Sequence, residues 1–172
     1  MGWADCPPDM PSDNTEAGGQ SAYPTPVHDM RLTTQTTTLR RLHADDLRLF
    51  QAYRNDPEVA RFQGWAAMDD GAATDFLTHM ASVTPLMRPG HWAQIAVADA
   101  ATDALLGDMG LHLSGDATEA ELGITLASAA QGKGHGVRAV MLAVGLLFDT
   151  TPITRIRAWA DARNAPSRRL ME

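Results

Sequence analysis

Three glycines at alternate positions precede a long apolar helix pattern, and this arrangement is suited to binding an anion. The segment reads Gln131-Gly132-Lys133-Gly134-His135-Gly136. Glycine permits tight backbone turns and a close approach of a ligand, because it has no Cβ atom. A helix over 137–148 directs its unpaired N–H groups and the positive end of its dipole at this loop. Phosphate or pyrophosphate is the usual ligand of such a site, although a flexible strand-to-helix connector has the same composition.

The spacing of the glycines distinguishes between known kinds of phosphate-binding loop. A P-loop requires a glycine, four residues and then Gly-Lys-Ser/Thr, whereas Lys133 is followed by Gly134 and lacks the upstream glycine. The dinucleotide pattern G-x-G-x-x-G/A is present from Gly134 to Ala139. In the dinucleotide-binding fold, however, the first glycine follows its strand almost at once and opens the domain. Here most of the chain lies upstream, which disfavours that interpretation.

The segment also has the form Q/R-x-x-G-x-G/A, which resembles the pyrophosphate loop of the GNAT superfamily of acyl-CoA-dependent N-acyltransferases. Three further segments match in collinear order and resemble the branch with the RimJ/RimL-type N-terminal acetyltransferases. They are Arg54-Asn55-Asp56-Pro57-Glu58-Val59, Glu121-Leu122-Gly123, and Ala158-Trp159-Ala160-Asp161 followed by Asn164-Ala165-Pro166-Ser167-Arg168-Arg169. The resemblance covers roughly residues 36–172.

This resemblance implies the reaction and the co-substrate. The acetyl group of acetyl-CoA passes to an amine, a protein N-terminus or a small molecule, by direct attack in a ternary complex. Pantetheine lies in a gap between two diverging strands, here 119–126 and 153–160, with a backbone N–H near Thr125 and Leu126 at the thioester oxygen. Asn164 hydrogen-bonds the pantetheine arm. The residues implied to hold the pyrophosphate are Gln131, Gly132, Lys133, Gly134, His135, Gly136 and Val137.

Glu121 and Ser167 are the candidate catalytic residues. With the period of two of a strand, Glu121 lies on the polar face of 119–126, where a carboxylate can accept the amine proton directly or through water. Orienting the substrate, or pairing with an arginine, is the alternative role. Ser167 has a family counterpart proposed to protonate the leaving thiolate, and capping the last helix is its alternative role. A tyrosine is the commoner acid in the superfamily, and none follows Tyr53.

The acceptor side is expected at Arg54-Asn55 and Phe62-Gln63-Gly64-Trp65, where aromatic groups beside carboxylates suit an amine. The histidines show no paired metal-ligand spacing, so we expect no metal. A different function, that of a non-catalytic acyl-CoA-binding domain or an inactive fragment, stays open. A homodimer is also possible as the oligomeric state.

Composition places the chain among single-domain proteins without a membrane span. It has 172 residues, a net charge of −7 and no apolar stretch long enough to cross a bilayer. Residues 1–30 contain five acids and no Lys or Arg, are rich in Pro, Gly and Ser, and are predicted to be disordered. The remaining domain, 31–172, is near neutral, so no nucleic acid is expected. One cysteine and no signal pattern favour the cytoplasm.

The pattern of the domain predicts an α/β fold with a mixed, mostly antiparallel sheet and helices on both faces. Strands are expected at 36–42, 92–98, 104–113, 119–126 and 153–160, and helices at 44–53, from Asp56-Pro57, at 70–83, at 136–148 and from Ala165. Family members continue past Glu172 through a turn, a Gly-Phe strand and a final strand. We therefore expect a domain that lacks its last strand pair.

Overall fold

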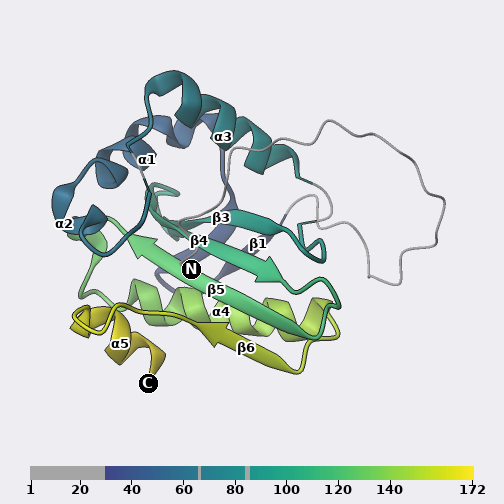
Figure 1. The fold of residues 1–172 in the computed structure, drawn as a ribbon. Helices are drawn as coiled ribbons and strands as arrows, with labels where there is room; N and C mark the ends of the chain where they lie inside the picture. Colours follow the sequence, from purple (N-terminus) through teal and green to yellow (C-terminus); the bar gives the residue numbers. More distant parts are fainter. Residues whose placement is uncertain (1–29, 66, 84–85) are drawn as a thin grey trace.

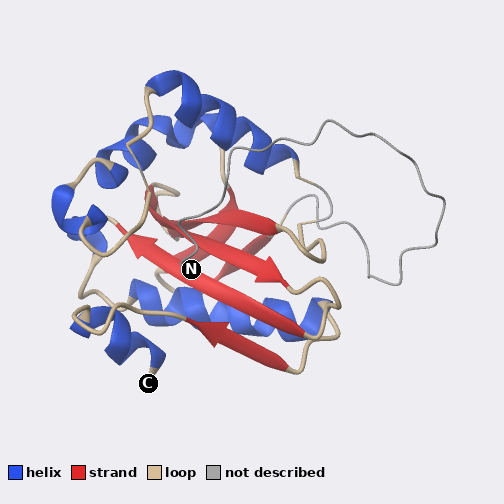
Figure 2. Ribbon diagram, viewed as in Figure 1, coloured by secondary structure: helices blue, strands red, loops and turns tan. Residues whose placement is uncertain are grey.

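Six strands of the described residues form one sheet whose order follows the chain, β1-β2-β3-β4-β5-β6 (Figures 1 and 2). This computed structural model describes residues 30–65, 67–83 and 86–172. The strands are β1 (Arg31–Thr33), β2 (Thr37–Arg41), β3 (Trp92–Asp99), β4 (Leu105–Leu113), β5 (Glu119–Leu126) and β6 (Arg155–Ala158). Neighbouring strands are antiparallel except β5 and β6, which are parallel. The predicted mixed, mostly antiparallel sheet is confirmed.

Helices cover both faces of this sheet, as the sequence predicted (Figure 2). Helices α1 (Leu47–Arg54), α2 (Pro57–Ala60) and α3 (Asp70–Ser82) lie on one side. Helix α4 (His135–Thr150) lies on the other, with α5 (Ala165–Met171) near its start. Single 3-10 turns occupy Ala44–Asp46 and Ser128–Ala130.

The sheet separates two hydrophobic cores, and the alternation of side chains along the strands decides which core each residue joins. The core on the α4 side includes Leu39, Ile95, Val97, Met109, Leu111, Leu122, Ala139, Ala143 and Leu147. The core on the α1–α3 side includes Leu42, Phe50, Tyr53, Ala73, Leu77 and Ala96. Ile124 and Leu126 pack against the α4-side core, which confirms that the alternate residues of β5 face the other way.

The structure differs from the predicted elements mainly in the following places. Strand β1 was not predicted, because three residues are too short for a periodicity signal. The helix expected over 44–53 begins as a 3-10 turn at Ala44–Asp46. The strand expected over 153–160 is only Arg155–Ala158, because it pairs with no more than four residues of β5.

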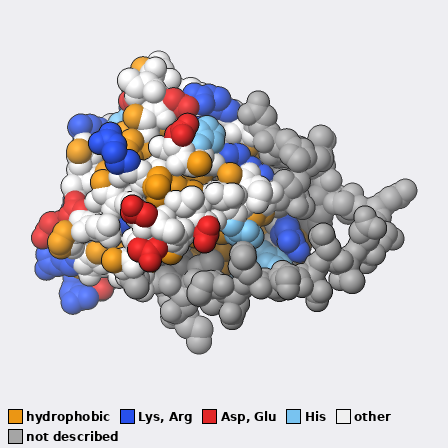
Figure 3. All heavy atoms as spheres, turned by 90° about the horizontal axis from the view of Figure 1, so that it is seen from above, with side chains coloured by type: hydrophobic (Ala, Val, Ile, Leu, Met, Phe, Trp, Pro, Cys, Tyr) orange, Lys and Arg blue, Asp and Glu red, His pale blue; other side chains and the backbone are white. Residues whose placement is uncertain are grey.

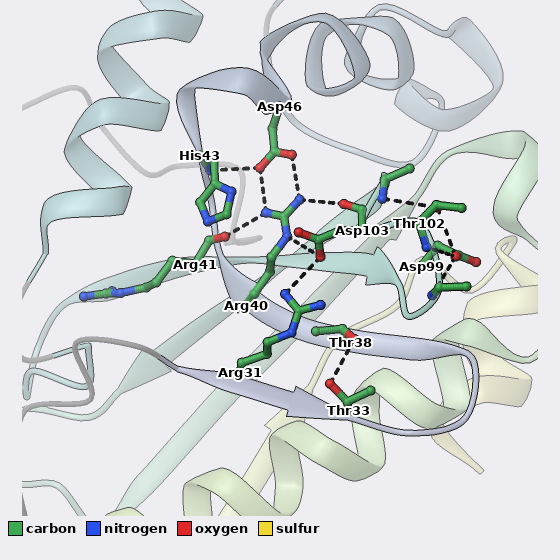
Figure 4. A network of polar contacts seen from close by, with 12 residues as sticks. Arg31, Thr33, Thr38, Arg40, Arg41, His43, Asp46, Asp99, Thr102 and Asp103 are labelled. Carbon is green, nitrogen blue, oxygen red and sulfur yellow. Dashed lines mark hydrogen bonds and ion pairs between the residues drawn. The ribbon is translucent and has the colours of Figure 1, made fainter.

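A buried ion pair joins β2 to the elements around it (Figure 4). The Arg40 guanidinium donates to both carboxylate oxygens of Asp46 at 2.8 Å, and its Nε donates to Asp103 at 3.1 Å. Asp103 also accepts from Arg31 at 3.1 Å. One guanidinium therefore ties the sheet to the start of α1 and to the turn between β3 and β4.

The predicted disordered segment 1–30 lies outside the described residues except for Met30, which is 2% exposed and belongs to the α4-side core. Across the described ranges, no helix combines the length and the apolar character needed to cross a membrane. Seen from the side of α1 and α3, acidic, basic and hydrophobic side chains intersperse on the described surface (Figure 3).

Candidate active site

Strands β5 and β6 stop pairing before β5 ends. The two strands pair from Glu119↔Arg155 to Leu122↔Ala158, and β5 then continues to Leu126 without a partner on that side in the described chain. Parallel strands that stop pairing leave backbone N–H and C=O groups available to an extended ligand. The pantetheine arm is expected in this gap, beside Thr125 and Leu126.

The glycine loop begins at the same end of β5. Gln131 donates its side-chain N–H to the carbonyl of Leu126 at 3.0 Å, which links the loop to the strand. Gly132 and Gly134 have φ values of +71° and +81°, in the left-handed region that favours glycine. Gly134 is the N-cap of α4. A Cβ at Gly132 would meet nothing within 4 Å, so this part of the loop is open.

The first turn of α4 presents backbone donors and no acid. Gln131, Gly132, Lys133 and Gly134 are exposed, and Arg138 donates to the carbonyl of Lys133 at 3.3 Å. The His135 ring instead lies buried on the sheet side, where its Nδ1 is 2.8 Å from the Thr37 hydroxyl. The backbone N–H of His135, and not its ring, is therefore the group that can bind a ligand. Gly136 is buried, and a Cβ there would lie 3.3 Å from Leu170 of α5, so this glycine serves close packing.

Glu121 lies in a row that crosses four strands on the α1–α3 side of the sheet. Its register partners are His112 on β4 and Arg157 on β6, and His112 in turn pairs with Trp92 on β3. The rings of His112 and Trp92 pack with centroids 5.1 Å apart. Glu121 is partly exposed. A carboxylate in this position can accept a proton from a group bound on this side of the sheet.

Asn164 and Ser167 lie together at the start of α5. The Asn164 side chain accepts from the Ser167 backbone N–H at 3.1 Å, and Asn164 is the N-cap of the helix. The capping role that had been an alternative for Ser167 therefore belongs to Asn164. Its side-chain amide N–H groups and the Ser167 hydroxyl are the groups that remain for a ligand.

Sequence reasoning missed Asp108, which pairs with Arg54 beneath the acceptor side. Arg54 Nη2 donates to Asp108 Oδ2 at 2.7 Å, and Gln94 donates to the same oxygen at 2.6 Å. The Asp108 and Arg54 side chains are 0% and 6% exposed. The available signal was the single acid of a mostly apolar strand, because a buried carboxylate requires a charged or polar partner.

The same cluster includes the hydroxyl of Tyr53. Burial raises the pKa of Tyr53 well above 10, and the negative charge of Asp108 raises it further. Burial alone would lower the pKa of Arg54, but the charge of Asp108 holds it above the ordinary value. Tyr53 is therefore a neutral hydroxyl beside a fixed ion pair. Within the described part of the chain, Tyr53 Oη, Arg54 Nε and Asp108 Oδ1 are buried without a hydrogen-bond partner.

Comparison with protein families gives a match over most of the chain. Residues 36–172 match the family described as acetyltransferase (GNAT) domain. A curated relative, the uncharacterized N-acetyltransferase p20 of Bacillus licheniformis, is 26% identical over 141 residues, which are 81% of this chain and 78% of that protein.

Solved structures share the fold. A GNAT-family acetyltransferase from Bacillus anthracis superposes with a TM-score of 0.71 at 18% identity and covers 83% of this chain and 80% of that one. RimJ from Mycobacterium smegmatis, in complex with CoA-disulfide, has a TM-score of 0.65 at 17% identity and covers 78% of this chain and 67% of that one. At these identities, the structural likeness shows the fold.

Proposed function

The chain belongs to the GNAT acetyltransferase domain family, and from this premise we propose that it transfers the acetyl group of acetyl-CoA to an amine. The domain 31–172 carries the activity, with a protein N-terminus or a small-molecule amine as the acceptor. One observation carries the proposal: β5 runs beyond its pairing with β6 and leads, through the 3-10 turn Ser128–Ala130, into the glycine loop at the start of α4. The site for an extended pantetheine arm, along β5, thus adjoins the site for its pyrophosphate, at the glycine loop.

Binding of acetyl-CoA is supported by the chemistry of these two places. The unpaired edge of β5 offers backbone groups to the pantetheine arm, and the N–H groups of 132–137 offer donors to the pyrophosphate. The backbone N–H of Gln131 already donates to the carbonyl of Ser128 at 3.3 Å. The solved RimJ structure was determined with CoA-disulfide. The acetyl carbonyl then lies near a backbone N–H at Thr125–Leu126, which stabilises the negative charge that forms on its oxygen.

Acetyl transfer needs a neutral amine and a protonated leaving thiolate. Glu121 takes the proton of the amine, directly or through water, on the side of the sheet that carries α1 and α2. The Ser167 hydroxyl supplies a proton to the thiolate as the carbon–sulfur bond breaks. The products are CoA and an acetylated amine. The RimJ/RimL-type branch favours a protein N-terminus as the acceptor.

Gly132 offers a sharp test of CoA binding. Asn and Asp both tolerate its left-handed backbone, and a side chain there meets open space. Gly132→Asp and Gly132→Asn therefore differ in charge and little in shape. The Asp variant should bind CoA at least about tenfold more weakly than the Asn variant in calorimetry, because its charge repels the pyrophosphate. Equal affinities, or no CoA binding by the unaltered chain, would refute the proposed site.

Turnover is the second half of the test. The unaltered chain is incubated with acetyl-CoA and each of three amines: a hexapeptide that begins with serine, spermidine, and kanamycin. Release of CoA thiol with any of them, together with a mass gain of one acetyl group on the amine, supports an enzyme. CoA binding without turnover of any amine favours the non-catalytic acyl-CoA-binding domain.

A further inference from the structure

The buried ion pair between Arg54 and Asp108 adjoins the candidate active site. It joins α1 to β4, and the reaction depends on how these two elements are placed relative to each other. Arg54 is the last residue of α1, and Asp108 lies in the middle of β4, directly opposite Thr125 of β5. Removing two charges from water is costly, and apolar residues of similar volume stabilise a fold as well or better. Stability alone is therefore a poor explanation for this pair.

The Arg54 guanidinium also supports an aromatic residue of the acceptor side. It lies 4.3 Å from the ring of Trp65 and 4.5 Å from the ring of Phe50. The Trp65 indole N–H donates to the backbone carbonyl of Arg54 at 3.3 Å. Trp65 thus contacts both the backbone and the guanidinium of Arg54, and Asp108 holds that guanidinium through the ion pair.

Residues 55–65, here named the acceptor segment, connect α1 to Trp65 and include α2. Two further contacts attach this segment to β5 and to the 3-10 turn that follows it. Gln63 donates to the Thr125 hydroxyl at 3.3 Å, and the Ser128 hydroxyl donates to Asp56 at 2.7 Å. The segment is thus held at its start by Arg54–Asp108 and along its length by two hydrogen bonds. Each of these contacts reaches β4, β5 or the residues between β5 and the glycine loop.

We propose that the Arg54–Asp108 pair is a positioning device that sets the acceptor segment at a fixed distance from the thioester end of β5. This proposal rests on the acetyl-transfer function proposed above. The pair acts on the amine substrate through Trp65, while the Gln63–Thr125 hydrogen bond is a second, separate attachment of the same segment. The pair makes no contact with the loop that binds CoA. Altering it changes use of the amine and leaves affinity for CoA intact.

The chain supplies a matched control for a test of this role. Arg40–Asp46 is also an Arg–Asp pair on the same side of the sheet, with 2.8 Å between its atoms and side chains 5% and 7% exposed. It makes no hydrogen bond or ion pair with the acceptor segment in the described residues. Asp108→Asn and Asp46→Asn both remove one buried charge and conserve shape. A merely structural role predicts the same consequences for both.

Hydrogen–deuterium exchange reads the position of the segment without any need for activity. Each variant is measured at the same interval below its own melting temperature. Under these conditions, Asp108→Asn should raise the exchange rate of the backbone amides in 55–65, whereas Asp46→Asn should leave it unchanged. With an amine that the unaltered chain acetylates, Asp108→Asn should raise the amine KM or lower kcat by about 10- to 100-fold, with CoA affinity within about threefold. Equal exchange in the two variants, or a parallel loss of amine and CoA binding, would overturn the proposal.

Gln63→Met is a second variant that preserves the fold if Asp108→Asn does not. Gln63 is only partly buried, so losing its bond to Thr125 should barely alter the melting temperature. It should still raise exchange in 55–65 and the amine KM, and unchanged values of both would count against positioning. If no amine is turned over, the proposed reaction fails, while the exchange data still show whether the pair holds the segment.

Discussion

Glu121 and Glu119 are two residues apart on the same strand and face, and their surroundings differ. Glu119 pairs with Arg155 at 3.0 Å and with Arg157 at 2.6 Å. Arg157 is the register partner of Glu121, yet its guanidinium reaches Glu119. Glu121 has no hydrogen bond or ion pair in the described residues. Its carboxylate is therefore available to a substrate, whereas that of Glu119 is already used.

We expect Glu121→Gln to lower kcat by about 10²–10⁴-fold, the usual scale of general-base catalysis, with CoA affinity little changed. Glutamine retains the shape and much of the hydrogen bonding but cannot take the proton. Steady-state kinetics on an amine that the unaltered chain acetylates provides the measurement.

Glu119→Gln is the matched control, since it removes a carboxylate from the same face and should leave kcat near normal. A raised KM with a normal kcat in Glu121→Gln would mean that Glu121 only positions the amine. A normal kcat with the low-pH limb of the rate profile retained would exclude Glu121 as the base. Water acting on an already neutral amine would then be the better mechanism.

At the scale of elements, the sequence predicted the helix starts and strand bounds that depend on neighbouring residues. The N-cap Asp56 followed by Pro57 predicted α2, and the Asp56 side chain does accept from the Glu58 N–H at 2.9 Å. Strand β5 was predicted with the bounds it has, because its apolar and polar residues alternate strictly. The glycine loop was placed at a helix start, and Gly134 is that N-cap.

Contacts between distant elements were beyond the reach of local patterns. The Arg54–Asp108 pair joins residues 54 positions apart, and the contact between Thr37 and His135 spans 98. Neither pairing has a spacing signal, because each depends on which strands become neighbours in the sheet. The position of the glycine loop at a helix start could therefore be predicted from sequence, whereas the contacts between distant elements around it could not.

The start of α4 depends on one of these distant contacts. Thr37 is fully buried, and its hydroxyl is the partner of the buried His135 ring. Thr37→Val conserves shape but leaves a ring nitrogen without a partner, so the free energy of unfolding should fall by about 1–3 kcal/mol. Urea denaturation gives this value. Thr154→Val, at an exposed site, is the control, and an equal stability of both variants would mean that this contact does not hold α4 on β2.

For the whole molecule, carboxylates in turns and loops contribute to the response to acid. The pKa of Asp99 is lowered by bonds from the backbone and hydroxyl of Thr102, and that of Asp116 by the hydroxyl of Ser114 and the backbone of Thr118. Burial would raise the pKa of Asp103, but the positive charges of Arg40 and Arg31 lower it. Hydrogen bonds from Arg163 lower that of Asp161 to about 2.

A carboxyl whose pKa is lower in the folded than in the unfolded state stabilises the fold above its unfolded value, here 3.8. That contribution is lost as the pH falls through the folded value. Since all these carboxyls shift downward, the melting temperature should be nearly flat from about pH 7 to 5 and should decline steadily between about pH 4 and 2. Thermal unfolding followed by circular dichroism across this range measures the decline.

Asp103→Asn separates this linkage from a general sensitivity to acid. Asp103 has a φ of +60°, which asparagine tolerates, so the substitution removes the charge without backbone strain. It should lower the melting temperature at neutral pH, because Arg31 and Arg40 lose a carboxylate. It should also make the decline below pH 4 shallower, because one of the linked groups no longer titrates. A variant that is less stable at pH 7 but loses stability just as steeply in acid would show that the Asp103 carboxylate is not among the linked groups.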